Sequence, residues 1–390
     1  MGWSSELAPR VLFAITVFNG PEVVPPCLRS AAGFVDDSCA IDILVLDDAS
    51  PLPGFSDDLR VLCSELGVEY YRSPRNLGVP RNVNLGLLRA VRGGYDYVVI
   101  ANSDVIFSQR VVEQLVRVCS SDDSIGSVTA WSNNVSIYSL PNAEPDGHLP
   151  DQRFVDWIAE AIRPEFGDEA VDIPAGISFC ICIPTHVVRK VGLMDPVFGR
   201  GYSEETDWTL RSKSLGYRIT LSPSAFAYHR GGGSNVAAGL VQQGHSAVPA
   251  NERIVDMRYP RFRSEVLAYQ HSGIPEALTQ RALRRITLEG ARAYGYEVTV
   301  GHLRGPEAGS ELARISIERD EHGLVAFAVF KGFTAELDLS ADDVITSLIA
   351  QVGREPTVIR MFDRRILRRG AGTTLDSYRV VSEVCYPPTV

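Results

Sequence analysis

Short apolar runs alternate with segments of helical periodicity through the first hundred residues. The runs 11–18, 41–46 and 97–101 are bounded by turn residues and predict strands. Segments 25–32 and 55–66, which separate these runs, have helical character. Strands that alternate with helices indicate a mostly parallel sheet. Ligands bind beyond the carboxyl ends of such strands, so the polar residues after each run are the first candidates for a site.

The pattern changes after residue 131. Segment 132–174 is rich in Asn, Pro and Gly and is interpreted as a loop region able to cover a cleft. The residues that follow predict a buried strand at 174–184 and helices at 185–192 and 205–215. Segment 235–261 has no clear periodicity.

A different alternation of elements begins near residue 262, where we place a domain boundary. The chain is therefore divided into an N-terminal tail (1–9), a first domain (10–261) and a smaller C-terminal α/β domain (262–390). The elements expected in the C-terminal domain are helices at 275–294 and 341–353 and strands at 312–318, 324–339 and 357–362.

Composition places the chain among ordinary globular proteins. Of its 390 residues, 45% are apolar and 22% are charged, which is enough to form a core in each of two domains. The net charge of −10 argues against nucleic acid as the main partner, because binding a phosphate backbone needs a clustered basic surface. The seven cysteines lack the paired spacing of a zinc site and are interpreted as buried free thiols.

No run of apolar residues reaches the length of about 20 that a membrane-spanning helix requires. The N-terminal tail also lacks the apolar run of a secretory signal. We therefore expect a cytoplasmic protein, and leave open a peripheral contact with the inner face of the membrane, where lipid-linked acceptors reside.

Acidic residues follow two of the predicted strands. Asp47 and Asp48 come directly after the second apolar run, and Asn102, Ser103 and Asp104 come after the third. Carboxylates at this edge suit a nucleotide or a hard divalent cation, which takes oxygen ligands and commonly keeps one or two carboxylates beside substrate phosphates. Each group alone could equally cap a turn at the end of a strand.

Two further groups of polar residues lie later in the chain. Glu204, Glu205 and Asp207 gather at the start of a predicted helix, where acids stabilise the helix dipole but where all three cannot serve as the cap. A carboxylate held near other carboxylates has a raised proton affinity, which suits a general base. His229 and Arg230 precede a glycine turn whose backbone can approach an anion closely.

From about residue 11 to residue 234, the chain resembles the family-two glycosyltransferases of the GT-A fold, in particular the rhamnosyltransferase-like enzymes that build bacterial surface polysaccharides. Each motif is degenerate, but the joint order and spacing are specific. The motifs are Thr16-Val17-Phe18-Asn19, Asp47-Asp48-Ala49-Ser50, Arg75-Asn76-Leu77-Gly78, Asn84-Leu85-Gly86, Asn102-Ser103-Asp104, Ser132-Asn133-Asn134, Ala175-Gly176, the stretch 198–207 and His229-Arg230-Gly231-Gly232-Gly233-Ser234.

The resemblance implies an α/β domain of the GT-A, Rossmann-like type with a mostly parallel central sheet, and it implies a role for each matching residue. Asp104 and His229 would hold a divalent metal, Mg²⁺ or Mn²⁺. Glu205 falls where the family usually carries its catalytic aspartate and is assigned as the base, with Glu204 as the competing candidate and Asp207 beside them. The residues implied around the nucleotide are Thr16, Asn19, Asp47, Asp48, Arg75, Asn84, Asn102, Ser103 and Asp104, and those implied at the acceptor are Tyr202, Trp208 and Arg211.

Two positions depart from the family pattern. Asn102 replaces the first acid of the usual acid-x-acid pair, and Glu205 is one carbon longer than aspartate. The extra carbon shifts the carboxylate by about one bond length, which a different acceptor depth can absorb. Neither departure removes a functional group that the chemistry needs.

The activity implied by the resemblance is an inverting, metal-assisted transfer of a sugar by single displacement with a carboxylate base. The donor would be a dTDP-, UDP- or GDP-linked sugar, and the acceptor a hydroxyl of a glycan or lipid-linked molecule in cell-wall or polysaccharide biosynthesis. Alternatives are transfer to a small natural product, a sugar-phosphate nucleotidyltransferase and a non-catalytic nucleotide- or glycan-binding module. The segment 19–22 lacks the glycine-rich loop typical of a nucleotidyltransferase. The C-terminal domain carries no catalytic motif and is a candidate for homo-oligomer formation.

Overall fold

The computed structural model of the chain describes residues 8–35, 38–135, 137–140, 150–231, 248–301, 312–319, 324–339, 344–362 and 380–381. Its contacts divide it into two compact units, with the described residues up to Pro275 in the first and those from Glu276 in the second. The first unit is therefore longer than the domain predicted to end near residue 262. The reason is that residues after 261 still contact the first unit: Phe262 packs against the cluster of Phe198, Leu210 and Val255, and Nζ of Lys213 lies 2.7 Å from the carboxylate of Glu265.

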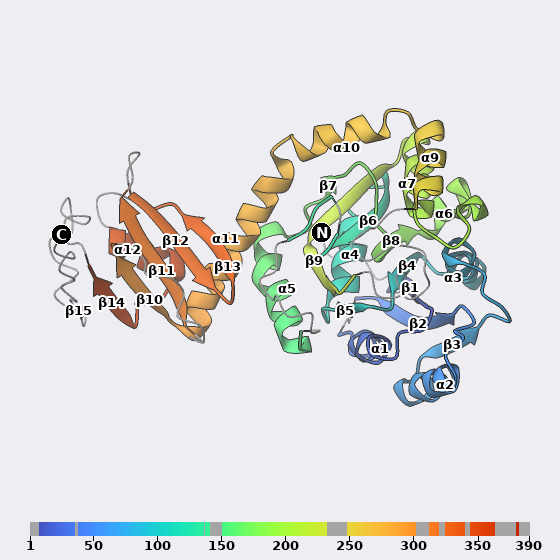
Figure 1. The fold of residues 1–390 in the computed structure, drawn as a ribbon, viewed down its shortest axis with the longest axis horizontal. Coiled ribbons are helices and arrows are strands. Elements are labelled where there is room, and N and C mark those ends of the chain that lie inside the picture. The colour runs from blue at the N-terminus through green and yellow to red at the C-terminus, as the bar shows by residue number, and fades with distance from the viewer. Residues whose placement is uncertain are drawn as a thin grey trace, which may run out of the picture. The chain divides into compact units, whose positions relative to one another are not determined.

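The first unit is built on a nine-stranded sheet with the order β3-β2-β1-β4-β8-β6-β9-β5, and β7 pairs with β9 (Figure 1). Strands β8, β5 and β7 run against the other six, so the sheet is mostly parallel, as the alternating pattern predicts. The strands are β1 (Arg10–Val17), β2 (Ala40–Asp47), β3 (Glu69–Arg72), β4 (Tyr97–Asn102), β5 (Val105–Phe107), β6 (Ile125–Trp131), β7 (Val171–Asp172), β8 (Cys180–Pro184) and β9 (Arg218–His229).

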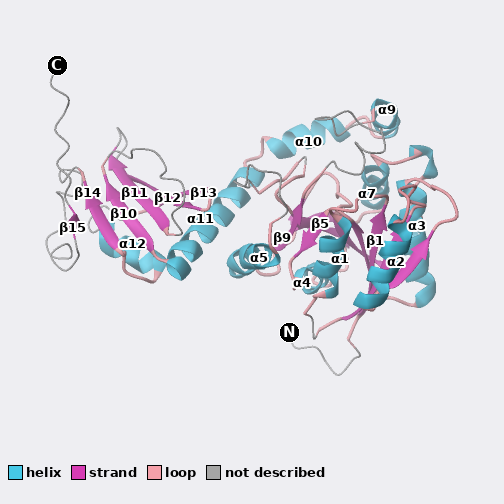
Figure 2. Ribbon diagram, turned by 60° about the horizontal axis from the view of Figure 1, so that its bottom comes forward, coloured by secondary structure: helices cyan, strands magenta, loops and turns pink. Residues whose placement is uncertain are grey.

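Helices flank the strands of this sheet (Figure 2). One apolar cluster joins one face of the sheet to α1, α2 and α4, and a second cluster joins the other face to α3, α6 and α7. The helices of the first unit are α1 (Val24–Ala32), α2 (Phe55–Leu66), α3 (Val79–Gly93), α4 (Val111–Cys119), α5 (Gln152–Phe166), α6 (Thr185–Val191), the short 3₁₀ helix η1 (Pro196–Phe198), α7 (Glu204–Ser214), α9 (Pro249–Arg258) and α10 (Phe262–Gln270).

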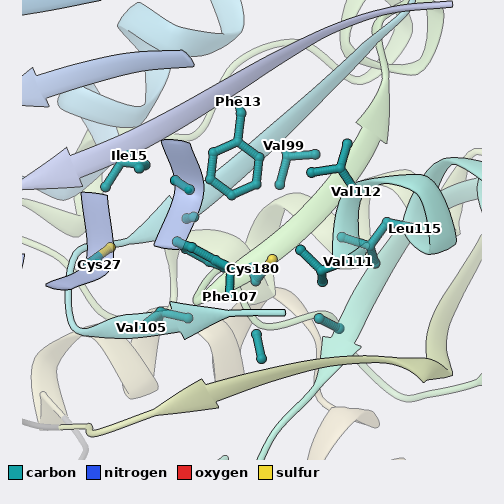
Figure 3. Packing of buried hydrophobic residues seen from close by; sticks show 14 of the residues in the cluster. Phe13, Ile15, Cys27, Val99, Val105, Phe107, Val111, Val112, Leu115 and Cys180 are labelled. Carbon is teal, nitrogen blue, oxygen red and sulfur yellow. The ribbon is translucent and has the colours of Figure 1, made fainter. Parts of the chain in front are cut away.

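The core follows from the alternation of side chains along the strands. In β1, Phe13 belongs to the cluster with α1, α2 and α4, whereas Leu12 belongs to the opposite cluster, because successive strand residues point to opposite faces. Phe13 packs edge-on against Phe107 with ring centroids 5.0 Å apart, close to Val99 and α4 (Figure 3). The six cysteines of the described residues are all free and buried, as the sequence predicts.

The register of the sheet brings the predicted site motifs to one edge. Strands β1, β2, β4, β6 and β9 all run in the same direction, so their carboxyl ends meet. Val17 pairs with Asp47, and Thr16 pairs with Asn102. His229 is the last residue of β9 and pairs with Val105. Thr209 of α7 and Thr129 near the end of β6 both lie against Gly176, so the first residues of α7 lie toward the carboxyl end of β6.

Three elements differ from the sequence predictions. Helix α5 lies within the segment interpreted as loop; Asp151 caps it by accepting hydrogen bonds from the backbone of Arg153 and Phe154. Helix α9 lies within the segment that showed no periodicity, because only Asn251 and Val255 on it are buried and no apolar stripe marks it. Strand β8 begins at Cys180 rather than at residue 174, since the preceding residues form turns.

The second unit is the predicted smaller α/β fold. Its six-stranded sheet has the order β13-β12-β11-β10-β14-β15. The strand predicted at 324–339 is a hairpin that turns at Lys331 and Gly332, both with positive φ. The elements are α11 (Ile274–Tyr294), β10 (Tyr296–Val300), β11 (Ala313–Arg319), β12 (Leu324–Phe330), β13 (Phe333–Leu337), α12 (Val344–Val352), β14 (Val358–Met361) and β15 (Val380–Val381). Across the part of the chain that the structure describes, each helix is either too short or too polar to cross a membrane.

Candidate active site

The loops that follow β1 and β2 are tied to each other by Asn19. Its backbone N–H donates to the hydroxyl of Ser50 at 2.8 Å, and its side-chain carbonyl accepts from the backbone of Leu52 at 3.3 Å. Asn19 and Ala49 both have positive φ, of 55° and 54°. These contacts form one continuous rim at the edge where the sequence predicts the nucleotide.

The buried carboxylate of Asp47 fixes this rim through hydrogen bonds. Asp47 is fully buried, and its carboxylate accepts hydrogen bonds from the backbone of Ser50, the hydroxyl of Ser56 and the hydroxyl of Tyr70. Burial acts to raise the pKa of Asp47, but the hydrogen bonds from Ser50 and Ser56 outweigh it and hold the pKa below its ordinary value. Because no part of Asp47 is exposed, it shapes the loop rather than contacting a nucleotide directly, which differs from the predicted role.

Asp48 holds a second loop in place. Its two carboxylate oxygens accept from the backbone N–H groups of Leu77 and Gly78, at 2.7 and 2.9 Å. This loop in turn pairs with the stretch before α7, because Val79 donates to the carbonyl of Arg200 at 3.2 Å. A single carboxylate thus couples the rim to the stretch that precedes Glu204 and Glu205.

Gly78→Ala is expected to lower the free energy of unfolding by about 1–3 kcal/mol, the usual cost of forcing extra atoms into a packed site. A Cβ at this position would overlap the carbonyl oxygen of Gly199. Gly192→Ala is the matched control, since Gly192 also has a positive φ with an extended ψ (−163°, against 157° for Gly78) but has no atom within 4 Å of the added Cβ. Thermal or urea unfolding of both variants separates the overlap from the backbone conformation, and equal losses would contradict the predicted overlap.

Asp104 and His229 face each other at the carboxyl ends of β4 and β9. Nε2 of His229 lies 3.3 Å from Oδ1 of Asp104, and both side chains are largely buried. Burial alone would raise the pKa of Asp104 and lower that of His229, but their mutual attraction outweighs it, so the pKa of Asp104 lies below and that of His229 above its ordinary value. Phe179 stacks on the imidazole with ring centroids 5.2 Å apart.

The loop after β6 fixes the orientation of His229. Nδ1 of His229 lies 2.9 Å from the carbonyl oxygen of Asn134, which can only accept, so Nδ1 carries the hydrogen and Nε2 faces Asp104. Asn133 bonds both the N–H and the carbonyl of His229. Gly231 approaches Asn134 so closely that a Cβ would overlap its side chain. The other members of this motif, residues 232–234, lie outside the described residues.

The Asp104 and His229 pair fits a divalent cation that takes its other ligands from phosphate. A metal-binding histidine usually donates its second ring N–H to a carbonyl or carboxylate, as Nδ1 does here. In the described ranges no group of three or more His, Cys, Asp or Glu side chains gathers as a metal site. Two protein ligands are what Mg²⁺ commonly keeps beside substrate phosphates.

Glu204 and Glu205 begin α7 as a buried pair of carboxylates. One oxygen of each, Oε2, is buried without a hydrogen-bond partner. Burial, followed by repulsion from Glu205, raises the pKa of Glu204 well above its ordinary value, and burial also raises the pKa of Glu205. The turn before them is strained: Tyr202 and Ser203 have φ of 71° and 74°, each costing about 1–2 kcal/mol for an L-residue.

Glu204→Gln is expected to raise the melting temperature at neutral pH by a few degrees. A carboxyl with a raised pKa binds more protons in the folded than in the unfolded chain, so stability falls as pH rises from the ordinary carboxyl pKa of about 4.3 through the raised folded value. Gln carries a neutral amide that does not titrate, so the variant does not lose this stability as pH rises. Melting curves from pH 4 to pH 8 should therefore diverge as pH rises, and a gain that does not vary with pH would contradict the raised pKa of Glu204.

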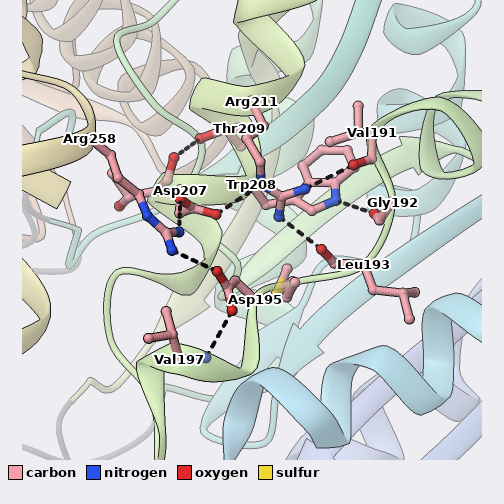
Figure 4. Close-up of polar contacts among 12 residues, drawn as sticks. Val191, Gly192, Leu193, Asp195, Val197, Asp207, Trp208, Thr209, Arg211 and Arg258 are labelled. Carbon is pink, nitrogen blue, oxygen red and sulfur yellow. Dashed lines mark hydrogen bonds and ion pairs between the residues drawn. The ribbon is translucent and has the colours of Figure 1, made fainter. Parts of the chain in front are cut away.

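Asp207, Trp208 and Arg211 form a buried network rather than an open surface (Figure 4). Asp207 is fully buried and accepts from Arg211 at 2.9 Å and from Arg258 at 2.8 Å. Trp208 is also fully buried, and its indole donates to the carbonyl of Gly192 at 2.8 Å. The guanidinium of Arg211 also bonds the carbonyls of Val191 and Leu193. The predicted catalytic role of Asp207 and the predicted acceptor contacts of Trp208 and Arg211 do not agree with this arrangement, because the three side chains fix α7 in place.

The remaining predicted residues divide into two groups. Thr16 and Asn102 are half-buried at the carboxyl edge, beside the buried Ser103, as the register requires. Asn84 instead faces α6 and the loop after it: its amide bonds both the N–H and the carbonyl of Met194 and so has a structural role. Arg75 is exposed.

Three residues at the site were not predicted from the sequence. They are Phe179, which stacks on His229; Tyr138, whose pKa Glu205 helps to raise; and Asn251, which bonds the stretch before Glu204. Tyr138 and Asn251 lie in the two segments that the sequence interpretation left without elements. Both residues reach the site only through contacts between segments that are distant in the sequence.

Comparison with known proteins identifies the class of the first unit. Residues 13–171 match the family model described as glycosyl transferase family 2. Over residues 13–171 the first unit is therefore similar to the family 2 glycosyltransferases, in agreement with the family predicted from the motifs.

One relative of known description is the undecaprenyl-phosphate mannosyltransferase of Micrococcus luteus. It is 25% identical to this chain over 236 residues, which is 60% of this chain and 89% of that protein.

Two solved glycosyltransferase structures are also similar. The first is GalNAc-T7 with UDP, GalNAc and Mn²⁺, at 16% identity and a TM-score of 0.44, where the match covers 58% of this chain but only 44% of that one. The second is the mannosyltransferase PcManGT from Pyrobaculum calidifontis with GDP-Man and Mn²⁺, at 14% identity and a TM-score of 0.45, covering 74% of this chain and 76% of that one.

Proposed function

We propose that this chain transfers a sugar from a nucleotide-diphosphate donor to a hydroxyl, with inversion at the anomeric carbon and assistance from Mg²⁺ or Mn²⁺. The observation that supports this most strongly is the shared sheet edge. Asp104 and His229 meet there, and the buried carboxylates of Glu204 and Glu205 begin a helix at the same edge. Sugar transfer needs a metal-binding group for the leaving phosphate and a base for the attacking hydroxyl within one site.

Asp104 and Nε2 of His229 would hold the metal, since their side chains are close and the histidine tautomer is set by Asn134. When bound, the cation would offset the charge that develops on the departing nucleoside diphosphate. Arg230 follows directly and lies 3.9 Å from the carboxylate of Glu22 on an exposed surface. Its charge would further favour a diphosphate at this end of the site.

Glu205 is the better candidate for the base. Two adjacent buried carboxylates cannot both ionise without large repulsion, so the pair keeps a proton on one of them. Backbone hydrogen bonds from Glu205 and Thr206 favour the ionised form of Glu205, whereas the carboxyl of Glu204 has one such bond. Glu204 would therefore hold the proton while Glu205 accepts one from the acceptor.

A base is needed for a hydroxyl acceptor but not for a phosphate acceptor, which is already ionised at neutral pH. The name of the Micrococcus luteus relative gives undecaprenyl phosphate. The unpartnered carboxylate oxygens of Glu204 and Glu205 favour a hydroxyl for this chain. Glycan assembly at the cell surface, a cytoplasmic location and oligomer formation through the second unit remain parts of the same proposal.

The stereochemistry tests the single displacement. The purified chain, supplied with the nucleotide sugar that it hydrolyses slowly in the absence of acceptor, is followed by proton NMR from the first minutes. We expect the first-formed free sugar to have the anomeric configuration opposite to that of the donor. A first-formed sugar of the same configuration would contradict inversion and indicate an enzyme-bound intermediate.

A further inference from the structure

Helix α9 holds the strained turn that precedes the two glutamates. The side-chain amide of Asn251 donates to the carbonyl oxygens of Phe198, Gly201 and Tyr202, at 3.0, 2.7 and 2.9 Å. Asn251 is 8% exposed, so water does not readily compete for these carbonyls. The side chain of Asn251 therefore bonds three carbonyl oxygens within the stretch 198–202.

The turn needs such an external partner. Tyr202 and Ser203 both have positive φ, and Gly201 has a φ of 134°. Non-glycine residues keep this conformation only where surrounding contacts fix it. Ser203, at the N-cap position of α7, makes no side-chain capping bond that would fix the turn from within. Two of the carbonyls that Asn251 binds belong to Gly201 and Tyr202 in this turn, and the third belongs to Phe198, three residues before it.

A second set of contacts anchors α9 itself to α7. Arg258 donates to Asp207 and to Asp195, each at 2.8 Å (Figure 4). The hydroxyl of Tyr259 donates to the same carboxylate of Asp207 at 2.9 Å. Helix α9 is thus fixed at both ends: Asn251 at its start bonds the turn before the glutamates, and Arg258 at its end bonds the residue two positions after Glu205.

We propose that Asn251 is a positioning residue that sets the direction of the Glu205 carboxylate toward the acceptor, acting through the strained turn at residues 201–203. This inference rests on the proposed function, in which Glu205 is the base. Asn251 lies outside the segment that matches the family model, at residues 13–171. Among the described residues, Glu204 and Tyr138 are titratable groups that interact with Glu205.

The test compares two truncations on one helix. Asn251→Ala removes the amide, and Met257→Ala is the control, since Met257 is 76% exposed. A misplacement of about 1 Å at a reacting group can cost about 100-fold in rate. We expect Asn251→Ala to lower kcat by about that factor and to leave the donor KM within about twofold, because Asp104 and His229 are untouched. Asn251→Gln, which keeps the amide, should recover part of the rate. Met257→Ala should match the wild type.

Two further readouts separate positioning from loss of stability. Water that enters the loosened turn would lower the pKa of the glutamate pair, so the acid limb of the kcat profile should shift to lower pH in Asn251→Ala only. Hydrogen exchange of the amides at 198–205 should also become faster in Asn251→Ala and not in Met257→Ala.

The outcomes distinguish the inference from the proposed function. Wild-type kcat and pH profile in folded Asn251→Ala would overturn the positioning role while leaving the transferase proposal intact. If the wild-type chain turns over no nucleotide sugar, the proposed function fails. Hydrogen exchange then still decides whether Asn251 fixes the turn, and unchanged exchange at 198–205 would overturn that as well.

Discussion

Glu205→Gln is expected to lower sugar transfer by about 10²–10⁴-fold, the range that a positioned general base contributes. The amide keeps the size of the side chain but cannot accept a proton from the acceptor. Nucleotide binding should stay within a few-fold of the wild type, because the Asp104 and His229 pair is unaffected. Steady-state kinetics with the donor, together with calorimetric titration of the nucleoside diphosphate in the presence of Mn²⁺, measure both quantities.

Glu204→Gln is the matched control for this prediction. It has the same chemistry one residue earlier, at a carboxyl whose pKa lies well above its ordinary value and which we expect to be protonated already. Its effect on transfer should be much smaller than that of Glu205→Gln. A Glu204→Gln variant that is inactive beside a Glu205→Gln variant that retains turnover would reverse the assignment of the base.

Asp104→Asn is expected to remove most of the metal-dependent part of nucleotide affinity, a loss on the order of 10- to 100-fold. The substitution replaces a charged ligand by a neutral one in a site where the described residues offer only His229 as a second ligand. Nucleotide titrations with Mn²⁺ and with EDTA should give nearly equal affinities for the variant.

Asp123→Asn controls for the change in net charge, because Asp123 lies exposed in the turn before β6. It should bind the nucleotide like the wild type in both conditions. An Asp104→Asn variant whose affinity still rises when Mn²⁺ is added would show that the metal, if bound, is held elsewhere.

The parts of the site that follow from strand direction could be predicted from the sequence. Asp47 and Asn102 lie at the ends of two predicted strands, and parallel strands bring their carboxyl ends to one edge whatever lies between them. The pairing of Asp104 with His229 rests on the antiparallel register of β5 and β9, in which Val105 and His229 are partners, and neither of these strands was predicted from the sequence.

The roles that depend on contacts between distant segments could not be predicted. Asp207 lies in an acidic motif, yet its carboxylate is taken up by Arg258, 51 residues later. Trp208 carries a polar group that sequence reasoning assigned to an acceptor, yet it bonds Gly192 inside the core. Neither partner leaves a periodic signal in the chain. Asn251 went unpredicted for the same reason, because α9 has few buried positions.

The most direct measurement of the central claim is release of nucleoside diphosphate from a panel of dTDP-, UDP- and GDP-linked sugars by the purified full chain. The reaction is followed with Mg²⁺, with Mn²⁺ and with EDTA. We predict that at least one donor is consumed only when metal is present, and that Asp104→Asn and Glu205→Gln each abolish this consumption. Turnover that is equal in EDTA, or the absence of binding and turnover with every donor, would contradict the account.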